Sequence, residues 1–215
     1  MKIRYSREIA PSLVVFGVLL ALSSPAKAQA PSTSAGATFY VSADAGSGGD
    51  GSRRSPFDSL SQAESASAAG DTIYLQASDS GKVLDGGIAL KPRQKLIGVG
   101  ANDALLEDAS DRVRLTNTAA LPGGVMVELS EQNEIAGIHF MNMGNAAISG
   151  ADTDYSGTFI HHATFTGNAT DHIEDERGLV YSISFDAASG SVDGIQVEDS
   201  SFYDGEDLGA IRVFQ

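Results

Sequence analysis

Ile138-His-Phe140-Met-Asn142 is the stretch that decides the fold, because the same arrangement returns twice further along the chain. It recurs as Ala163-Thr-Phe165-Thr-Gly-Asn168 and as Ser200-Ser-Phe202-Tyr-Asp204. Each copy places a phenylalanine before a polar turn, and a short run that contains isoleucine follows each copy. Short strands that repeat in this way are typical of a solenoid, in which successive coils stack and share one core.

The isoleucines recur at nearly the same intervals as the phenylalanines. Phe140 and Phe165 are 25 residues apart, and the isoleucines that follow them are separated by the same interval. The next interval is 37 residues for phenylalanine and 38 for isoleucine, which we interpret as one coil plus an insertion over Leu179–Gly190. Because the interval is shared, we expect one position of each coil to face inward at Ile148, Ile173 and Ile211.

Short runs of β-forming residues, separated by Gly, Asn and Asp, make up most of the chain from Thr38 onward. An antiparallel β-sandwich is the alternative arrangement, but it would join its strands by two-residue Asn-Gly or Asp-Gly turns, and few occur between the matched runs. We therefore expect an all-β fold of stacked parallel coils. The predicted strands are 38–42, 71–75, 88–90, 95–98, 113–115, 125–129, 135–140, 146–148, 158–165, 179–185, 194–197 and 210–214.

One short helix is expected near the start of this region. Ser55 is a suitable N-cap, Pro56 fits the first helical position, and Gly70 ends the segment. Apolar residues recur between them at helical spacing, at Phe57, Leu60 and Ala63.

The first thirty residues have the layout of a secretion signal. Three basic side chains precede the apolar run Leu13–Leu22, and small residues follow it up to Ala28. The run is shorter than the roughly 20 residues that span a bilayer. We expect a signal peptide over 1–28, a flexible leader over 29–37 and the β-helix domain over 38–215. The mature protein is then secreted, periplasmic or held at the cell surface, with no membrane span.

The composition excludes several classes of protein. Lys and Arg number 14 against 28 Asp and Glu, for a formal net charge of −14, and the chain has no cysteine. Removal of residues 1–28 leaves 10 basic and 27 acidic side chains, or −17. A nucleic-acid partner is not expected, because such binding needs a basic surface. Disulfide-stabilised and zinc-cysteine modules need thiols and are excluded as well.

Several segments resemble secreted right-handed parallel β-helix proteins of the pectin-lyase-like superfamily. The stretch 55–60 with 70–75 is similar to the N-terminal signature of that superfamily, and Lys95-Leu-Ile-Gly-Val-Gly100 to an early coil of pectate lyases. Residues 133–142 and 158–165 resemble the coils that follow. The resemblance covers about residues 38–215. It implies a right-handed parallel β-helix whose short N-terminal helix caps the first coil.

The chain departs from pectate lyases at positions that carry their chemistry. His161 stands where they have an aspartate, and the chain lacks their Arg-x-Pro-x-x-Arg stretch, so their catalytic residues are not carried over. The sequence also stops at Ile211-Arg-Val-Phe-Gln215, in the middle of a predicted strand without a polar cap. We therefore expect the β-helix to be truncated at its C-terminus and to continue into further coils or another module.

The predicted register also suggests a saccharide site. If isoleucines face inward, their neighbours face outward, which places Glu174 beside Arg212 on adjacent coils. In known β-helix proteins such a face often carries the groove for a saccharide. The alternative is a solvated ion pair on a β surface. The predicted saccharide-binding residues are His172, Glu174 and Arg212.

Acidic turns one coil apart suggest a calcium site. Calcium takes six to eight oxygen ligands from carboxylates and carbonyls, although the chain has no Asp-x-Asp-x-Asp-Gly loop, and a solvated acidic turn is the alternative. His161 and His162 are expected on opposite faces of their strand, so that both cannot easily bind one metal. The predicted Ca²⁺ ligands are Asp152, Asp154, Glu174 and Asp175.

Three functions fit these patterns. The first is an exported β-helix that presents a lateral groove to an extracellular polysaccharide. The second is a polysaccharide lyase or glycoside hydrolase, for which no firm pair of catalytic carboxylates is found. The third is an adhesin or autotransporter passenger that uses the solenoid as a stalk.

Overall fold

The computed structural model describes residues 36–99, 112–118, 125–143, 146–151, 154–168, 180–186, 193–203 and 208–214. They belong to one compact unit, Ser34–Gln215. The strands within it are β1 (Thr38–Val41), β2 (Thr72–Leu75), β3 (Leu84–Asp85), β4 (Ile88–Ala89), β5 (Lys95–Gly98), β6 (Val113–Thr116), β7 (Val127–Glu128), β8 (Glu134–Ala136), β9 (Ile138–Met143), β10 (Ile148–Ala151), β11 (Phe159–His161), β12 (Thr164–Asn168), β13 (Val180–Asp186), β14 (Gln196–Glu198), β15 (Ser201–Tyr203) and β16 (Leu208–Phe214).

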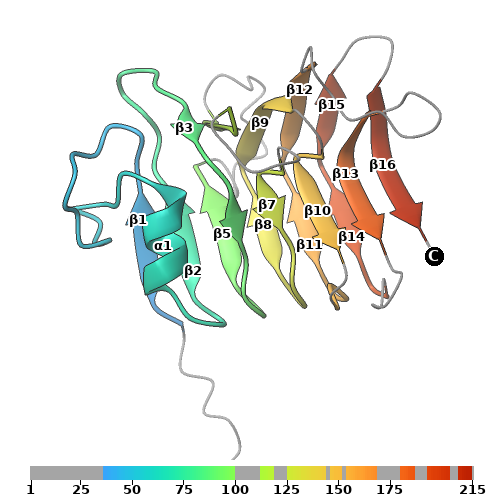
Figure 1. Ribbon diagram of the computed structural model, residues 1–215, viewed down its shortest axis with the longest axis horizontal. Coiled ribbons are helices and arrows are strands. Elements are labelled where there is room, and N and C mark those ends of the chain that lie inside the picture. The colour runs from blue at the N-terminus through green and yellow to red at the C-terminus, as the bar shows by residue number, and fades with distance from the viewer. Residues whose placement is uncertain are drawn as a thin grey trace, which may run out of the picture. The chain divides into compact units, whose positions relative to one another are not determined.

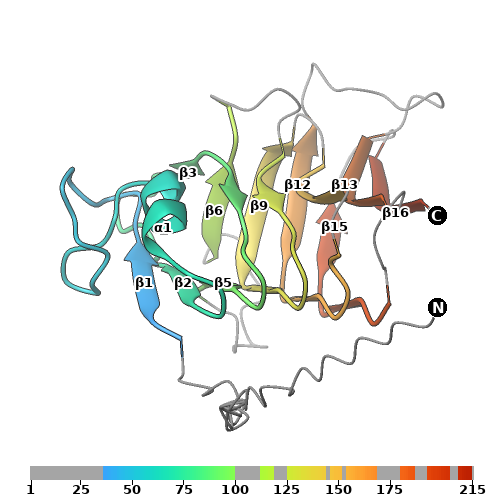
Figure 2. The same ribbon diagram turned by 60° about the horizontal axis from the view of Figure 1, so that its bottom comes forward.

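These strands form three sheets that the chain visits in turn. The first sheet has the order β1-β2-β5-β8-β11-β14, the second β3-β6-β9-β12-β15 and the third β4-β7-β10-β13-β16. Neighbouring strands come from successive coils, and they pair in parallel in all three sheets. Figures 1 and 2 show the coils following one another from β1 to β16. The predicted parallel solenoid is confirmed, and the antiparallel sandwich is excluded.

Apolar residues fill the inside of the coils in continuous rows. In the first sheet Leu96, Ile135 and Ile160 are paired across three strands and have no exposed surface. In the second sheet Phe165 stacks between two other rings, with ring centroids 5.0 Å from Phe140 and 4.8 Å from Phe202. The phenylalanine register predicted from the sequence is therefore confirmed.

The predicted isoleucine register is wrong in its middle member. In the third sheet Ile148 pairs with Ile183, and Ile183 pairs with Ile211. The segment interpreted as an insertion thus contains β13, a full strand of the coil, whereas Ile173 lies outside the described residues. β13 alternates between apolar and polar residues, so that Ile183 and Phe185 are both buried and continue the inward row.

A buried polar row closes the corner between the third sheet and the first. Gln94, Asn133 and Thr158 precede strands of three successive coils, and each is at most 1% exposed. The Gln94 and Asn133 side chains each accept a hydrogen bond from the backbone nitrogen three residues earlier, at 2.8 and 2.6 Å. The Thr158 hydroxyl donates to the oxygen of Tyr155, also three residues earlier, at 2.7 Å. These side chains satisfy backbone groups that the turn would otherwise leave unpaired inside the molecule.

The residue before each of these polar side chains adopts the left-handed conformation. Arg93, Gln132 and Gly157 have φ values of 59°, 54° and 67°. Their backbone nitrogens donate to a carbonyl of the next coil, at 2.9, 2.8 and 2.9 Å. The corner is thus a repeated turn of fixed conformation, which keeps successive strands of the first sheet in register.

The helix α1 (Leu60–Ala66) is shorter than predicted and begins later. Its N-cap is Ser59, not Ser55. Phe57 is extended instead, because its backbone bonds both ways with β1: its nitrogen donates to Tyr40 at 2.9 Å, and its oxygen accepts from Ser42 at 3.0 Å. Leu60 and Ala63 are buried in the core as predicted. Figure 2 places α1 beside β1.

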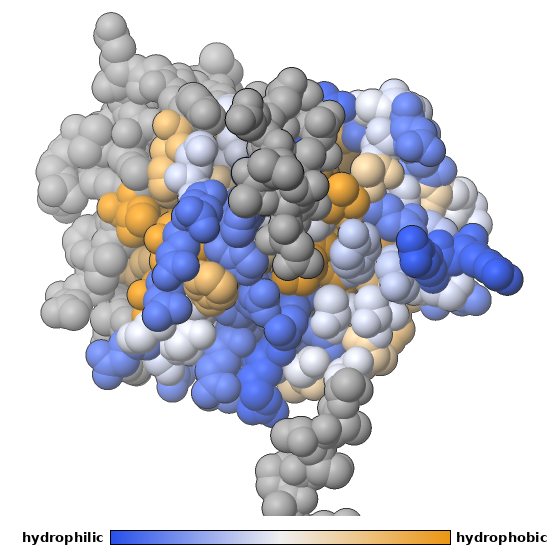
Figure 3. Space-filling view, turned by 180° about the vertical axis from the view of Figure 1, so that it is seen from behind, coloured by the Kyte–Doolittle hydropathy of each residue, from blue (hydrophilic) through white to orange (hydrophobic). Residues whose placement is uncertain are grey.

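No helix of the described residues is long and apolar enough to cross a membrane. Among the described large apolar side chains, Ile211 of β16 is exposed, at 42%. It keeps the register of the inward row, and Figure 3 shows apolar surface on the side of the molecule where β16 lies.

Candidate saccharide-binding site

Alternate residues of the first sheet face away from the core and form two outer rows. One row contains Lys95, Glu134 and Phe159, which are paired across β5, β8 and β11. The other begins with two aromatic side chains, Tyr40 of β1 and Tyr74 of β2, which are also paired. The outer face of this sheet is therefore aromatic at its first two strands.

Tyr40 and Tyr74 line an open hollow of about 460 Å³. Their ring centroids are 5.5 Å apart and their planes are tilted by 54°, so the two rings are inclined to each other and do not stack flat. Arg53 and Gln76 also line the hollow, and the Gln76 amide donates to the backbone oxygen of Arg53 at 3.2 Å. The hollow combines two aromatic faces with side chains that can donate and accept hydrogen bonds.

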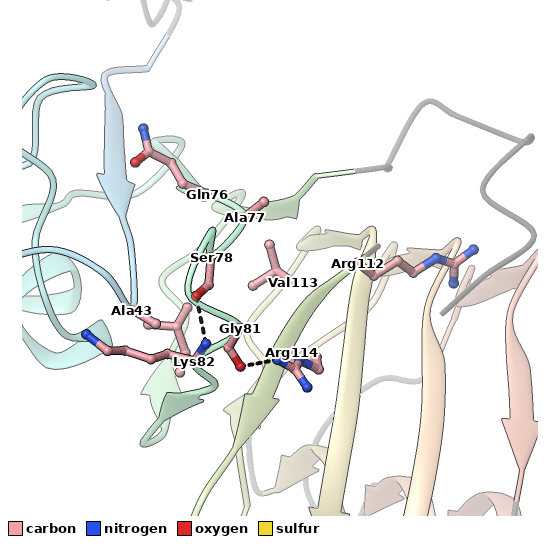
Figure 4. Close-up of a pocket in the computed structure, with 10 residues that line it drawn as sticks. Ala43, Gln76, Ala77, Ser78, Gly81, Lys82, Arg112, Val113 and Arg114 are labelled. Carbon is pink, nitrogen blue, oxygen red and sulfur yellow. Dashed lines mark hydrogen bonds between the residues drawn. The ribbon is translucent and has the colours of Figure 1, made fainter. Parts of the chain in front are cut away.

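A second, smaller hollow of about 200 Å³ adjoins the first and shares Gln76 and Ala77 with it. It is lined by three cationic side chains, Lys82, Arg112 and Arg114. Figure 4 shows Arg114 beside Gly81, whose oxygen accepts its hydrogen bond, whereas Arg112 points away from that pair.

The contacts of these cations decide which of them can meet a ligand. Arg112 donates to the Thr164 hydroxyl at 2.7 Å, so its guanidinium group is bound to β12 of the second sheet. Lys82 lies 3.8 Å from the Asp44 carboxylate, and its side chain is 62% exposed. Exposed pairs at this distance are weak. Lys82 is therefore able to leave Asp44 for a ligand at little cost.

Of the predicted saccharide-binding residues, Arg212 is the one that lies within the described part of the chain. The neighbour of Arg212 on the adjacent strand is Ser184, and not Glu174 as predicted. The error follows from the isoleucine register, since β13 occupies the place that was given to residues around Ile173. His172 and Glu174 lie outside the described residues.

The predicted calcium ligands are described only at Asp154. This side chain is exposed, and it accepts a hydrogen bond from the backbone nitrogen of Ser156 at 3.0 Å. Hydrogen bonds from the Ser156 backbone and hydroxyl lower the pKa of Asp154 below its usual value. Asp152, Glu174 and Asp175 lie outside the described residues, so the calcium site stays a prediction.

Sequence reasoning missed the tyrosine pair, although the signal was present. Thr38-Phe-Tyr-Val41 and Thr72-Ile-Tyr-Leu75 share one pattern, and the structure pairs them residue for residue. The interval between these two stretches contains α1, so it differs from the 25-residue interval of the later coils. A comparison of segments at that interval therefore does not detect the tyrosine pair.

No protein-family model, curated protein or solved structure matches this chain.

Proposed function

We propose that the protein is an exported right-handed parallel β-helix of the pectin-lyase-like kind that binds an extracellular polysaccharide. The observation that carries the proposal is the hollow of about 460 Å³ lined by Tyr40 and Tyr74 on the outside of the first sheet. In this proposal α1 caps the first coil, with Leu60 and Ala63 buried against it.

The chemistry of the hollow suits a sugar. A pyranose ring has apolar C–H faces and a rim of hydroxyl groups, so it needs an aromatic surface and hydrogen-bonding side chains together. Tyr40 and Tyr74 supply the aromatic surface, and Arg53 and Gln76 supply donors and an acceptor beside it. The hollow is open, which suits a ligand that continues beyond it, such as a chain of sugars.

The adjoining hollow extends the proposed site. Lys82 and Arg114 place positive charge next to Gln76 in a chain whose formal net charge is −14. Charge-assisted hydrogen bonds are the stronger ones, so this end would hold a polar substituent on a neighbouring sugar. The sugar chain would then run from the tyrosine pair toward Lys82.

The test is a glycan-binding screen, followed by affinity measurements on the best oligosaccharide. Tyr74→Ala should weaken binding about tenfold, which corresponds to about 1.4 kcal/mol, while Tyr74→Phe keeps most of it. Gln196→Ala is the matched control, since Gln196 is exposed on β14 of the same sheet. Equal affinity of Tyr74→Ala and the parent would exclude this hollow. Detection of shortened products in the same samples would indicate the lyase or hydrolase alternative.

A further inference from the structure

His161 and His162 lie on one side of the chain, contrary to the expectation from strand alternation. Their Nδ1 atoms are 2.9 Å apart, and the ring planes meet at 80°. The reason is the backbone of His162, whose φ is 50°. β11 ends at His161, so His162 starts the corner and no longer follows the alternation of the strand.

The corner that holds His162 is built into the coil. Gly137 and Asp199, the corresponding residues of the neighbouring coils, also have positive φ, of 68° and 46°. The His162 nitrogen donates to the oxygen of Glu198 in the next coil at 3.3 Å. The position of the His162 ring is therefore a consequence of the fold and not of one side-chain rotamer.

The His161 ring is held on two further sides. Phe159 stacks on it, with centroids 4.3 Å apart and planes 22° apart. Nε2 of His161 lies 3.2 Å from one carboxylate oxygen of Glu134, and the other oxygen of Glu134 is 2.5 Å from the Lys95 ammonium group.

The Glu134 carboxylate fixes the tautomer of His161. An ionised carboxylate can only accept a hydrogen bond, so Nε2 of His161 carries the proton and its Nδ1 presents a lone pair to Nδ1 of His162, 2.9 Å away. Asp199 lies 3.9 Å from Nε2 of His162, beyond hydrogen-bond distance, so His162 can carry its proton on Nδ1 and donate it to His161. A metal ion can take the place of that proton, because it needs the same two nitrogens facing one position.

We propose that His161 and His162 bind one divalent transition-metal ion, such as Zn²⁺ or Cu²⁺, through their Nδ1 atoms. Imidazole nitrogen suits these metals, whereas calcium prefers oxygen. Histidine ligands commonly donate their other N–H to a carboxylate, the role that Glu134 has here for His161. Tetrahedral zinc with Zn–N of about 2.0–2.1 Å separates two ligand nitrogens by roughly 3.3 Å. The rings therefore need to part only slightly.

The site has two protein ligands, and water completes the coordination. No group of three or more His, Asp or Glu side chains in the described part of the chain is arranged around one metal position. The site is reachable, since the side chains of His162 and Asp199 are 19% and 72% exposed. Two ligands hold a metal more weakly than three, and they leave coordination positions open to an oxygen of a bound molecule.

Calorimetric titration of the full chain, prepared without added histidines, tests the proposal with Zn²⁺ and Cu²⁺ as probes. We expect one ion per chain, an affinity at least tenfold weaker in His161→Ala and His162→Ala, and a 10- to 100-fold loss in Glu134→Gln. The chain has four histidines, and His139→Gln, on β9 of the second sheet, is the matched control that should bind as the parent does. Binding that survives both histidine substitutions, or is absent from the parent, would overturn the site.

Nitrogen-15 NMR of the parent protein makes the test independent of whether the variants fold. Zn²⁺ should move the Nδ1 resonances of His161 and His162 and leave Nε2 of both rings protonated. Ligation through Nε2, or a shift confined to His139 or His172, contradicts the proposal. A shared proton that millimolar Zn²⁺ does not displace from between the rings contradicts it too.

Discussion

The side-chain amide of Asn133 donates to the backbone oxygen of Gln94 at 3.1 Å, so the corner of one coil is tied to the corner of the coil before it. The same amide nitrogen also donates to the oxygen of Lys91 at 2.9 Å. The Asn133 side-chain oxygen accepts from the Ser130 nitrogen at 2.6 Å. One side chain with 1% exposure thus closes its own turn and joins two turns together.

Replacing Asn133 by Ala should therefore lower the free energy of unfolding far more than the small size of the side chain suggests. It leaves the Ser130 nitrogen without its partner and removes one of the two hydrogen bonds that the Lys91 and Gln94 oxygens each accept, so we expect a loss of about 2–4 kcal/mol in the free energy of unfolding. Urea denaturation followed by circular dichroism measures it. Glu131→Ala, in the same turn but partly exposed, is the control, and a similar loss in both variants would argue against the amide network.

Gly157 is expected to resist substitution because of its backbone conformation. Its φ is 67°, and a Cβ would lie 3.2 Å from Cγ of Gln132. Gly157→Ala should destabilise the protein by about 1–2 kcal/mol. Gly46→Ala is a matched control, since a Cβ there would have no atom within 4 Å and the φ of Gly46 is not positive. Thermal melting compares the two, and a neutral Gly157→Ala would contradict the left-handed corner.

Phe165 lies between two phenylalanine rings of neighbouring coils and has no exposed surface. Phe165→Ala opens a cavity between coils and removes both ring contacts, so we expect a loss of about 3–5 kcal/mol in the free energy of unfolding. Phe159→Ala should cost less, because Phe159 faces outward and is only partly buried. Chemical denaturation of both variants measures the difference, and a larger loss at Phe159 would contradict the inward phenylalanine row.

The sequence predicts this fold where a coil repeats one residue type at a fixed interval. The phenylalanine row could be found because the rings stack directly and tolerate few replacements. The isoleucine row could not, because both Ile173 and Ile183 are preceded and followed by polar residues, and only pairing with Ile148 and Ile211 distinguishes them. An interval in the sequence does not show which segment of a long coil forms the strand.

The candidate sites depend on backbone conformations and loop positions that the pattern of residues along the sequence does not predict. The meeting of His161 and His162 follows from a left-handed φ at a residue that is not glycine, which neither composition nor alternation predicts. Tyr40 and Tyr74 could have been matched by their shared pattern, but their position beside Gln76 and Arg53 depends on how the loops after β1 and β2 fold.

The contribution of the Asp44 carboxylate to stability is expected to depend on pH. Hydrogen bonds from the Ser80 hydroxyl and then from the Ser80 backbone lower the pKa of Asp44 to about 2. The pKa in the unfolded chain is about 3.9. A lowered pKa means that the folded state favours the ionised carboxylate. The stabilisation is therefore fully present above the unfolded value and is lost as the pH falls through about 2.

Carboxyl NMR titration of the folded protein should accordingly place the Asp44 midpoint near 2. Ser80→Ala removes the hydroxyl bond, so the midpoint should rise toward the unfolded value, and Ser65→Ala, on α1 and away from Asp44, should leave it in place. Because Asp44 is exposed, the associated change in stability is reduced by solvent screening, and the midpoint itself is the quantity to measure. If Ser80→Ala leaves the Asp44 midpoint unchanged, the hydroxyl contact does not set the pKa. The charge of Lys82, whose ammonium group is 3.8 Å from Oδ1 of Asp44, would then be the next cause to test by Lys82→Gln.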